Sequence, residues 1–148
     1  MYRKPKAGID YVGVSIVFFC HDGQGRVLMA KRSENARDEH GKWDIGAGKV
    51  EVGDSVEETL HKEIQEEYST EVISYEFLGF RDVHRMQNEV HTHWITLDFK
   101  VLVRPENVAI GEPAKFSDIG WFNKNQIPSN EQLHSQLPFF FQKYSEQL

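Results

Sequence analysis

Three glutamates, Glu63, Glu66 and Glu67, fall at i, i+3 and i+4 and therefore share one face of a predicted helix. Like charges at these spacings repel one another, and the C-terminal end of a helix is unfavourable for anions. A cation among the three carboxylates removes this cost, and oxygen ligands favour Mg²⁺ or Mn²⁺ over zinc. Taken alone, the triplet is explained more simply as a solvated acidic helix face. The glycine-rich segment upstream favours the metal site, because it can bring a backbone carbonyl to the same ion.

The helix that carries the triplet is predicted over about 55–68. Asp54 with Glu57, or Ser55 with Glu58, fits a capping box at its start. Apolar residues spaced four apart predict one buried stripe along it: Val56, Leu60 and Ile64.

The remaining elements must position this helix. Strands are expected at 12–20, 26–31, near Trp43 to Ile45, and at 71–82, 91–103 and 116–122. They are joined by a polar loop at 33–42, a glycine-rich loop at 46–53, a loop from Met86 to Glu89 and a loop at 104–115. A final helical stripe, which Pro138 either starts or breaks, consists of Leu133, Leu137, Phe141 and Tyr144. The absence of a βαβ rhythm predicts an α/β (α+β) sandwich around a mixed sheet.

Length and composition set limits on function. The 148 residues predict a single domain over 1–148. A net charge of −6 argues against a protein that grips nucleic acid, although it allows a nucleotide substrate bound through a cation. Cys20 is the one cysteine, so no disulfide is expected within the chain and a cytoplasmic protein is predicted. The apolar run from Val12 to Cys20 loosely imitates a signal peptide but fits a buried strand better, and no run approaches the ~18 residues of a membrane span.

The segment from Gly48 to Thr70 resembles the signature of the Nudix hydrolases, G-x5-E-x7-R-E-U-x-E-E-x-G-U, where U is a bulky aliphatic residue. The spacing matches throughout and the glutamate core is intact. Four positions differ from the pattern, namely Asp54 for Glu, Lys62 for Arg, Ser69 for Gly and Thr70 for the aliphatic residue. The preceding WDIGAG also differs from the commoner W-x-x-P-G-G. The hairpin that ends in LMAKR and the run EPAKFSDIGWFNKNQIP extend the resemblance over roughly 10–145.

This resemblance implies an α/β/α sandwich with a central mixed sheet, and a reaction in which water attacks a nucleoside diphosphate linked to another group. It assigns the metal ligands to Glu63, Glu66, Glu67 and the Gly48 carbonyl, with Glu112 as a distal carboxylate. Glu66 or Glu63 is the expected general base, and Mg²⁺, with Mn²⁺ as an alternative, is the expected cofactor. Lys62 lacks the planar fork with which the family's arginine orients a glutamate.

Substrate contacts are expected from Arg32, Lys49, His93 and Asn130. For Arg32 the alternative is a surface residue at a strand end. For Asn130 a cap for the C-terminal helix is favoured over a substrate contact. His91 and His93 form an H-x-H pair on one strand face. With no other obvious nitrogen or sulfur ligands beside them, a place on the pocket wall or sheet rim is favoured over a zinc site.

The layout after the signature most resembles compact pyrophosphatases of nucleoside triphosphates or modified dNTPs, which release nucleoside monophosphate and pyrophosphate. The alternatives are a non-catalytic nucleotide-sensing domain and a hydrolase of ADP-ribose, NDP-sugars or dinucleoside polyphosphates. Isopentenyl diphosphate isomerase fits least, because Cys20 lies inside the first strand. The expected partner is a small-molecule nucleotide, with no nucleic acid or membrane, and the chain is expected to be a monomer or homodimer.

Overall fold

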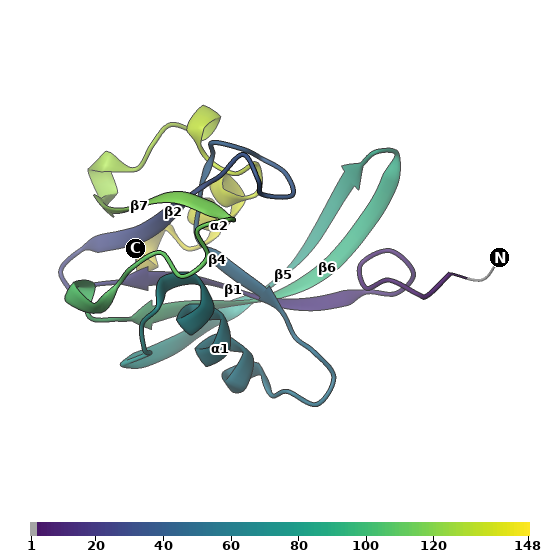
Figure 1. Ribbon diagram of the computed structural model, residues 1–148, viewed down its shortest axis with the longest axis horizontal. Coiled ribbons are helices and arrows are strands. Elements are labelled where there is room, and N and C mark those ends of the chain that lie inside the picture. Colours follow the sequence, from purple (N-terminus) through teal and green to yellow (C-terminus); the bar gives the residue numbers. More distant parts are fainter. Residues whose placement is uncertain (1–2) are drawn as a thin grey trace.

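The computed structural model describes residues 3–148 and places a seven-stranded mixed sheet between two α-helices (Figure 1). The strands are β1 (Gly13–His21), β2 (Arg26–Arg32), β3 (Trp43–Asp44), β4 (Gly46–Lys49), β5 (Ser74–Gln87), β6 (Val90–Leu102) and β7 (Phe116–Asn123). The helices are α1 (Val56–Tyr68) and α2 (Leu137–Lys143), and the short 3-10 turns are η1 (Pro105–Asn107), η2 (Lys124–Gln126), η3 (Asn130–Gln132) and η4 (Ser145–Gln147).

The strand order is β3-β2-β1-β6-β5, with β4 also paired to β1 and β7 to β2. The β1–β6 pair is parallel and the other pairs are antiparallel. This mixed sheet between two helices confirms the predicted fold class. Among residues 3–148, neither helix is long enough to cross a membrane.

Strand β1 supplies side chains to both faces of the sheet, as expected for a central strand with period two. Phe18 and Cys20 pack in the cluster that includes Leu60 and Ile64 of α1. Phe19 packs in the opposite cluster, which includes Phe140 of α2. The two clusters fix α1 and α2 on opposite faces, and the cysteine is buried as a strand residue.

A buried polar network fastens α2 to the sheet. The fully buried Asp98 carboxylate accepts hydrogen bonds from Arg81 Nε (2.7 Å) and Nη2 (3.0 Å) and from Tyr144 Oη (2.6 Å). The Arg81 guanidinium also lies over the Phe140 ring. Because the charge is paired and hydrogen-bonded, removing one partner leaves a buried carboxylate poorly satisfied.

Helix α1 starts at a capping box, as the sequence predicts. Of the two alternatives, the structure uses Ser55 and Glu58. Ser55 Oγ accepts from the Glu58 backbone N–H (3.0 Å), and the Ser55 N–H donates to the Glu58 carboxylate (3.2 Å). The helix ends at Ser69, whose left-handed φ of 52° occupies the position where the Nudix pattern has glycine.

Three elements differ most from the prediction. The segment expected as a loop from residue 46 begins with strand β4, because its backbone pairs with β1 from Phe18 to Ser15 despite the low strand preference of glycine. Strand β5 begins three residues after the expected start and ends at Gln87, five residues beyond the expected end, so it includes the first two residues of the loop expected from Met86. Helix α2 begins at Leu137, so Pro138 lies in its first turn and Leu133 precedes the helix.

Strands β5 and β6 form a long hairpin whose distal half extends away from α1 and α2 (Figure 1). Asn88 and Glu89 form its two-residue turn, both with positive φ (51° and 65°). The turn therefore determines which residues of β5 and β6 lie opposite each other, beginning with Gln87 opposite Val90. The distal half gains support where the His93 N–H donates to the Gly8 carbonyl (2.8 Å).

Candidate active site

The acidic face of α1 lies against the glycines of β4. A Cβ on Gly48 would lie 2.3 Å from Glu63 Cδ, and a Cβ on Gly46 would lie 2.9 Å from Glu67 Oε2. Glycine at position 48 lets the Glu63 carboxylate approach the β4 backbone. At position 46, the nearest atoms to an added Cβ would be those of the Phe18 ring, at 2.1 Å, so glycine there makes room mainly for that ring.

Glu67 is the most unusual of these carboxylates. Its side chain is buried. Among the side chains of residues 3–148, Glu67 Oε2 is the one buried oxygen or nitrogen atom that has no hydrogen-bond partner. Its other oxygen, Oε1, accepts a hydrogen bond from Lys115 Nζ at 3.3 Å. Burial raises the pKa of Glu67 from its ordinary 4.5 to about 8, with the Lys115 charge opposing the rise and the Glu63 charge adding to it.

Glu63 is half-buried, and its pKa is raised mainly by this burial and, to a smaller extent, by repulsion from Glu66. The Glu112 charge raises the pKa of both Glu63 and Glu67, which places Glu112 in the same electrostatic environment. The Glu66 side chain is exposed at the edge of this group. The charges of the four predicted acidic ligands therefore influence one another, but among residues 3–148 no three of them have ligand atoms within 4.8 Å of one another.

The loop that carries Glu112 is held against the end of α1 by backbone contacts. The Gly111 N–H donates to the Glu67 carbonyl (2.9 Å), and a Cβ on Gly111 would lie 2.0 Å from the Glu66 carbonyl oxygen. Ser33 fastens the other end of the loop, because its Oγ donates to the Ala114 carbonyl (2.6 Å). These contacts position Glu112 and Lys115 beside the α1 glutamates.

Lys115 is a site residue that the sequence prediction missed. It lies in the EPAK run, whose resemblance to the family was recognised without a role for the lysine. Lys62, which replaces the family's arginine, is exposed, and its charge lowers the pKa of Glu63. The direct ion pair to a signature glutamate comes instead from Lys115, on a different loop.

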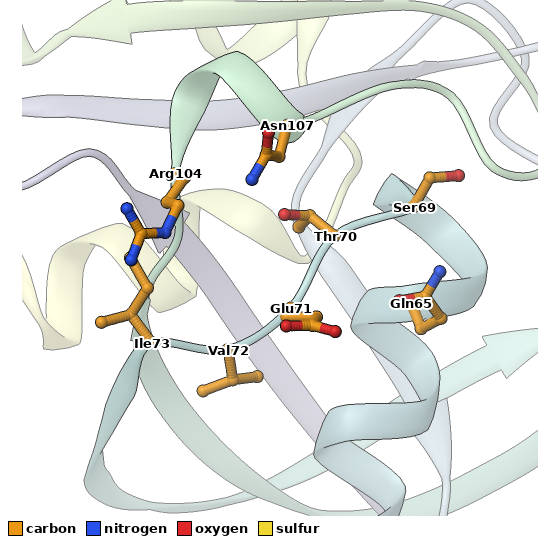
Figure 2. Close-up of a pocket in the computed structure, with 8 residues that line it drawn as sticks. All are labelled: Gln65, Ser69, Thr70, Glu71, Val72, Ile73, Arg104 and Asn107. Carbon is orange, nitrogen blue, oxygen red and sulfur yellow. The ribbon is translucent and has the colours of Figure 1, made fainter.

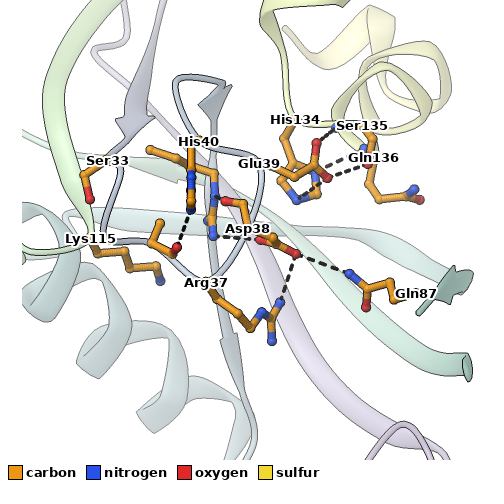
Figure 3. Close-up of polar contacts among 12 residues, drawn as sticks. Ser33, Arg37, Asp38, Glu39, His40, Gln87, Lys115, His134, Ser135 and Gln136 are labelled. Carbon is orange, nitrogen blue, oxygen red and sulfur yellow. Dashed lines mark hydrogen bonds and ion pairs between the residues drawn. The ribbon is translucent and has the colours of Figure 1, made fainter.

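Among residues 3–148, none of the four predicted substrate contacts forms a hydrogen bond or ion pair with a signature glutamate. Arg32 is only 8% exposed, and its Nε and Nη2 donate to the Asp38 carbonyl (2.9 Å) and carboxylate (3.0 Å). It therefore holds the loop 33–42, in which Asp38 also contacts Arg37 and Gln87 (Figure 3). Lys49 is exposed and points from the face of β4 opposite to that of Gly48, with Glu51 3.8 Å away.

Asn130 begins the η3 turn, where its carbonyl accepts a hydrogen bond from the Leu133 N–H (3.2 Å). It does not cap α2, whose N-cap is Gln136, so the alternative prediction for Asn130 was wrong. The Asn130 side chain is exposed. His93 lies on the hairpin, where its partner is Asp82 rather than any signature glutamate.

A recess of about 660 Å³ lies beside the C-terminal end of α1 (Figure 2). None of the site carboxylates lines it. Its wall consists of Gln65, Ser69, Thr70, Glu71, Val72, Ile73, Arg104 and Asn107. The recess is therefore separate from the acidic chemistry on the β4 side of the helix.

Buried and half-buried carboxylates lie beside the β4 backbone, and one of their oxygens has no hydrogen-bond partner. Such hard oxygen atoms are the kind of ligand that divalent cations prefer. The family model of the NUDIX domain matches residues 11–143. The chain therefore belongs to the Nudix family, and it is a hydrolase that acts on phosphorus-containing anhydrides.

The similarity to individual proteins of known name or structure is lower, at 21–26% sequence identity for the three described next. The chain is 26% identical over 110 residues to nucleoside triphosphatase NudI of Salmonella paratyphi B, covering 70% of this chain and 77% of that protein. The MutT NUDIX hydrolase from Burkholderia pseudomallei superposes with a TM-score of 0.76 at 23% identity, covering 89% of this chain and 97% of that one. The NUDIX domain of Shewanella oneidensis NrtR, solved with ADP ribose, superposes with a TM-score of 0.69 at 21% identity, covering 96% of this chain and 89% of that one. These two structures show the shared fold.

Proposed function

We propose that this chain is a Mg²⁺-dependent pyrophosphatase of nucleoside triphosphates, either ordinary or modified (d)NTPs, that releases nucleoside monophosphate and pyrophosphate. The substrate class is supported by the similarity to a nucleoside triphosphatase over most of the chain. Support for the metal comes from the site itself, because its ligands are hard oxygen atoms.

The observation that carries the proposal is the buried, unpartnered Oε2 of Glu67. A buried charged oxygen without a partner is costly, and Lys115 contacts only the other oxygen. A cation beside Oε2 removes this cost, so the residues present fit a divalent ion. The ion would be held by Glu67 together with Glu63, Glu66 and the Gly48 carbonyl, and Glu112 would complete the ligand set.

When bound, the metal neutralises the charge that develops on the phosphate oxygens. The residues of the chain then have separate tasks. Lys115 and the β4 glycines hold Glu67 and Glu63 in place, and Glu66 or Glu63 accepts the proton of the attacking water. The water oxygen forms a bond to one of the two phosphorus atoms that flank the α–β bridging oxygen, and the bond from that phosphorus to the bridging oxygen breaks. The electron pair stays on the bridging oxygen, which leaves with the other phosphate group, so the products are nucleoside monophosphate and pyrophosphate.

The test is a substrate panel of (d)NTPs, oxidised dNTPs, ADP-ribose, NDP-sugars and diadenosine polyphosphates, with Mg²⁺ and Mn²⁺ supplied separately. Product nucleotides are identified by chromatography, and the reaction is repeated in ¹⁸O-labelled water. We expect turnover of triphosphates with pyrophosphate as co-product, and the product that carries the label identifies the phosphorus that water attacks. Turnover restricted to ADP-ribose or NDP-sugars would overturn the substrate class, and tight nucleotide binding without turnover would indicate a sensor.

The variant Glu67→Gln removes one metal ligand with almost no change in volume. We expect it to lose at least roughly a hundredfold in kcat/KM, since metal-site partners commonly contribute that much. The matched control is Glu57→Gln, which changes an exposed glutamate in the first turn of the same helix. Equal activity of the two variants would contradict the metal assignment.

A further inference from the structure

The β5–β6 hairpin gathers a second set of metal-ligating side chains. Asp82 and His84 on β5 and His91 and His93 on β6 project from the same face. The strand register places His84 directly opposite His93. The H-x-H pair therefore acquires, from the neighbouring strand, the ligands that local sequence did not offer.

Three of the four side chains already have ligand atoms close enough to share an ion. One ligand atom from each of Asp82, His84 and His93 lies within 4.8 Å of the other two. His93 Nε2 lies 2.9 Å from Asp82 Oδ1, and His84 Nδ1 lies 2.9 Å from His91 Nε2. In a tetrahedral zinc site, with bonds near 2.0–2.1 Å, ligand atoms are roughly 3.3 Å apart. His91 lies outside this group of three and contacts His84, so it must move toward Asp82 and His93 to serve as the fourth ligand.

The imidazoles are also arranged face to face. The His84 ring stacks on His93 with centroids 4.1 Å apart, and on His91 at 5.1 Å. A metal binds to an imidazole through the nitrogen lone pair, so protons compete with the ion for these side chains.

We propose that Asp82, His84, His91 and His93 form a binding site for Zn²⁺ or a closely related divalent transition ion. Three imidazole nitrogens and one carboxylate oxygen are a ligand set for zinc and not for Mg²⁺. The site spans both strands of the hairpin near its turn, so the bound ion joins β5 to β6 where the hairpin extends from the body of the protein (Figure 1). This inference is independent of the proposed substrate.

The test uses full-length protein without an affinity tag, stripped of metal by a chelator and kept in millimolar Mg²⁺ to occupy the carboxylate site. Zn²⁺ is titrated by calorimetry and Co²⁺ by its visible absorption, and the imidazole resonances are followed by NMR. We expect one ion per chain, a tetrahedral Co²⁺ band, shifts of the three hairpin histidines and a higher melting temperature with Zn²⁺.

Variants separate this site from other histidines and from the active site. His84→Asn is expected to weaken Zn²⁺ binding at least roughly tenfold to a hundredfold. The control His61→Asn, which changes an exposed histidine on α1, keeps full affinity, and so does Glu67→Gln. Since His84 is exposed, the fold is expected to persist in the variant, which circular dichroism verifies.

Three results would overturn the proposal. The first is a lack of saturable Zn²⁺ or Co²⁺ binding when Mg²⁺ is present. The second is affinity that survives His84→Asn, which would place the ion elsewhere. The third is one ion for every two chains, which would show a site between molecules instead of within one hairpin.

Discussion

Glu67→Gln changes how stability depends on pH. In the metal-free protein, burial raises the pKa of Glu67 from 4.5 to about 8, so between these values the folded state binds a proton that the unfolded state has released. The free energy of unfolding therefore decreases as the pH rises through this interval. The difference between the two pKa values corresponds to roughly 5 kcal/mol of destabilisation by the charged form. Glutamine carries no such charge, so the variant loses this decrease.

The assay is urea denaturation of both proteins at a series of pH values from about 4 to 9 with a chelator present. Other groups titrate in both proteins, so the difference between the two curves reports the titration of Glu67 together with its electrostatic coupling to neighbours such as Glu63. We expect the variant to become the more stable protein toward pH 8 and above. Added Mg²⁺ is expected to flatten the wild-type curve, because the cation favours the charged carboxylate. Parallel curves without metal would refute the reasoning.

Three further perturbations test separate parts of the structure. Gly48→Ala places a methyl group against Glu63, and we expect roughly a hundredfold loss of kcat/KM with little loss of folding, measured by kinetics and denaturation. Lys115→Met removes the partner of Glu67, so we expect weaker Mg²⁺ binding at neutral pH in calorimetry, partly restored by Lys115→Arg. Tyr144→Phe removes a buried hydrogen bond and should lower the free energy of unfolding by about 1–3 kcal/mol, whereas the same change at an exposed tyrosine should have little effect.

The parts of the fold governed by local periodicity were predicted from the sequence. The start of α1 follows from its capping box, and the apolar alternation in the central strands follows from burial on one or both faces. Strand β4 was not predicted, because glycines carry no strand pattern and it forms through pairing with β1. The end of β5 was also missed, since exposed residues in the extended hairpin show no apolar alternation.

The residues missed at both sites depend on contacts between distant parts of the chain. Lys115 reaches Glu67 because the loop before β7 is fastened to β2 and α1, and no local spacing records this. The partners of the H-x-H pair could have been predicted from the sequence with one further piece of information. With the turn placed at Asn88 and Glu89, counting equally along both strands sets His84 opposite His93. The missing information was the position of a two-residue turn.

Ligand chemistry keeps the two proposed metal sites distinct. The α1 site offers carboxylate and carbonyl oxygens, which suit Mg²⁺, and the hairpin site is dominated by imidazole nitrogens, which Mg²⁺ binds poorly. Excess Mg²⁺ should therefore occupy the first site and leave the second available for Zn²⁺. Zn²⁺ is less selective between the two sites, because it also accepts carboxylate oxygen and can bind at the α1 glutamates. Inhibition of the hydrolase by Zn²⁺ that persists in His84→Asn would consequently arise at the glutamates, whereas inhibition lost in that variant would arise from the hairpin.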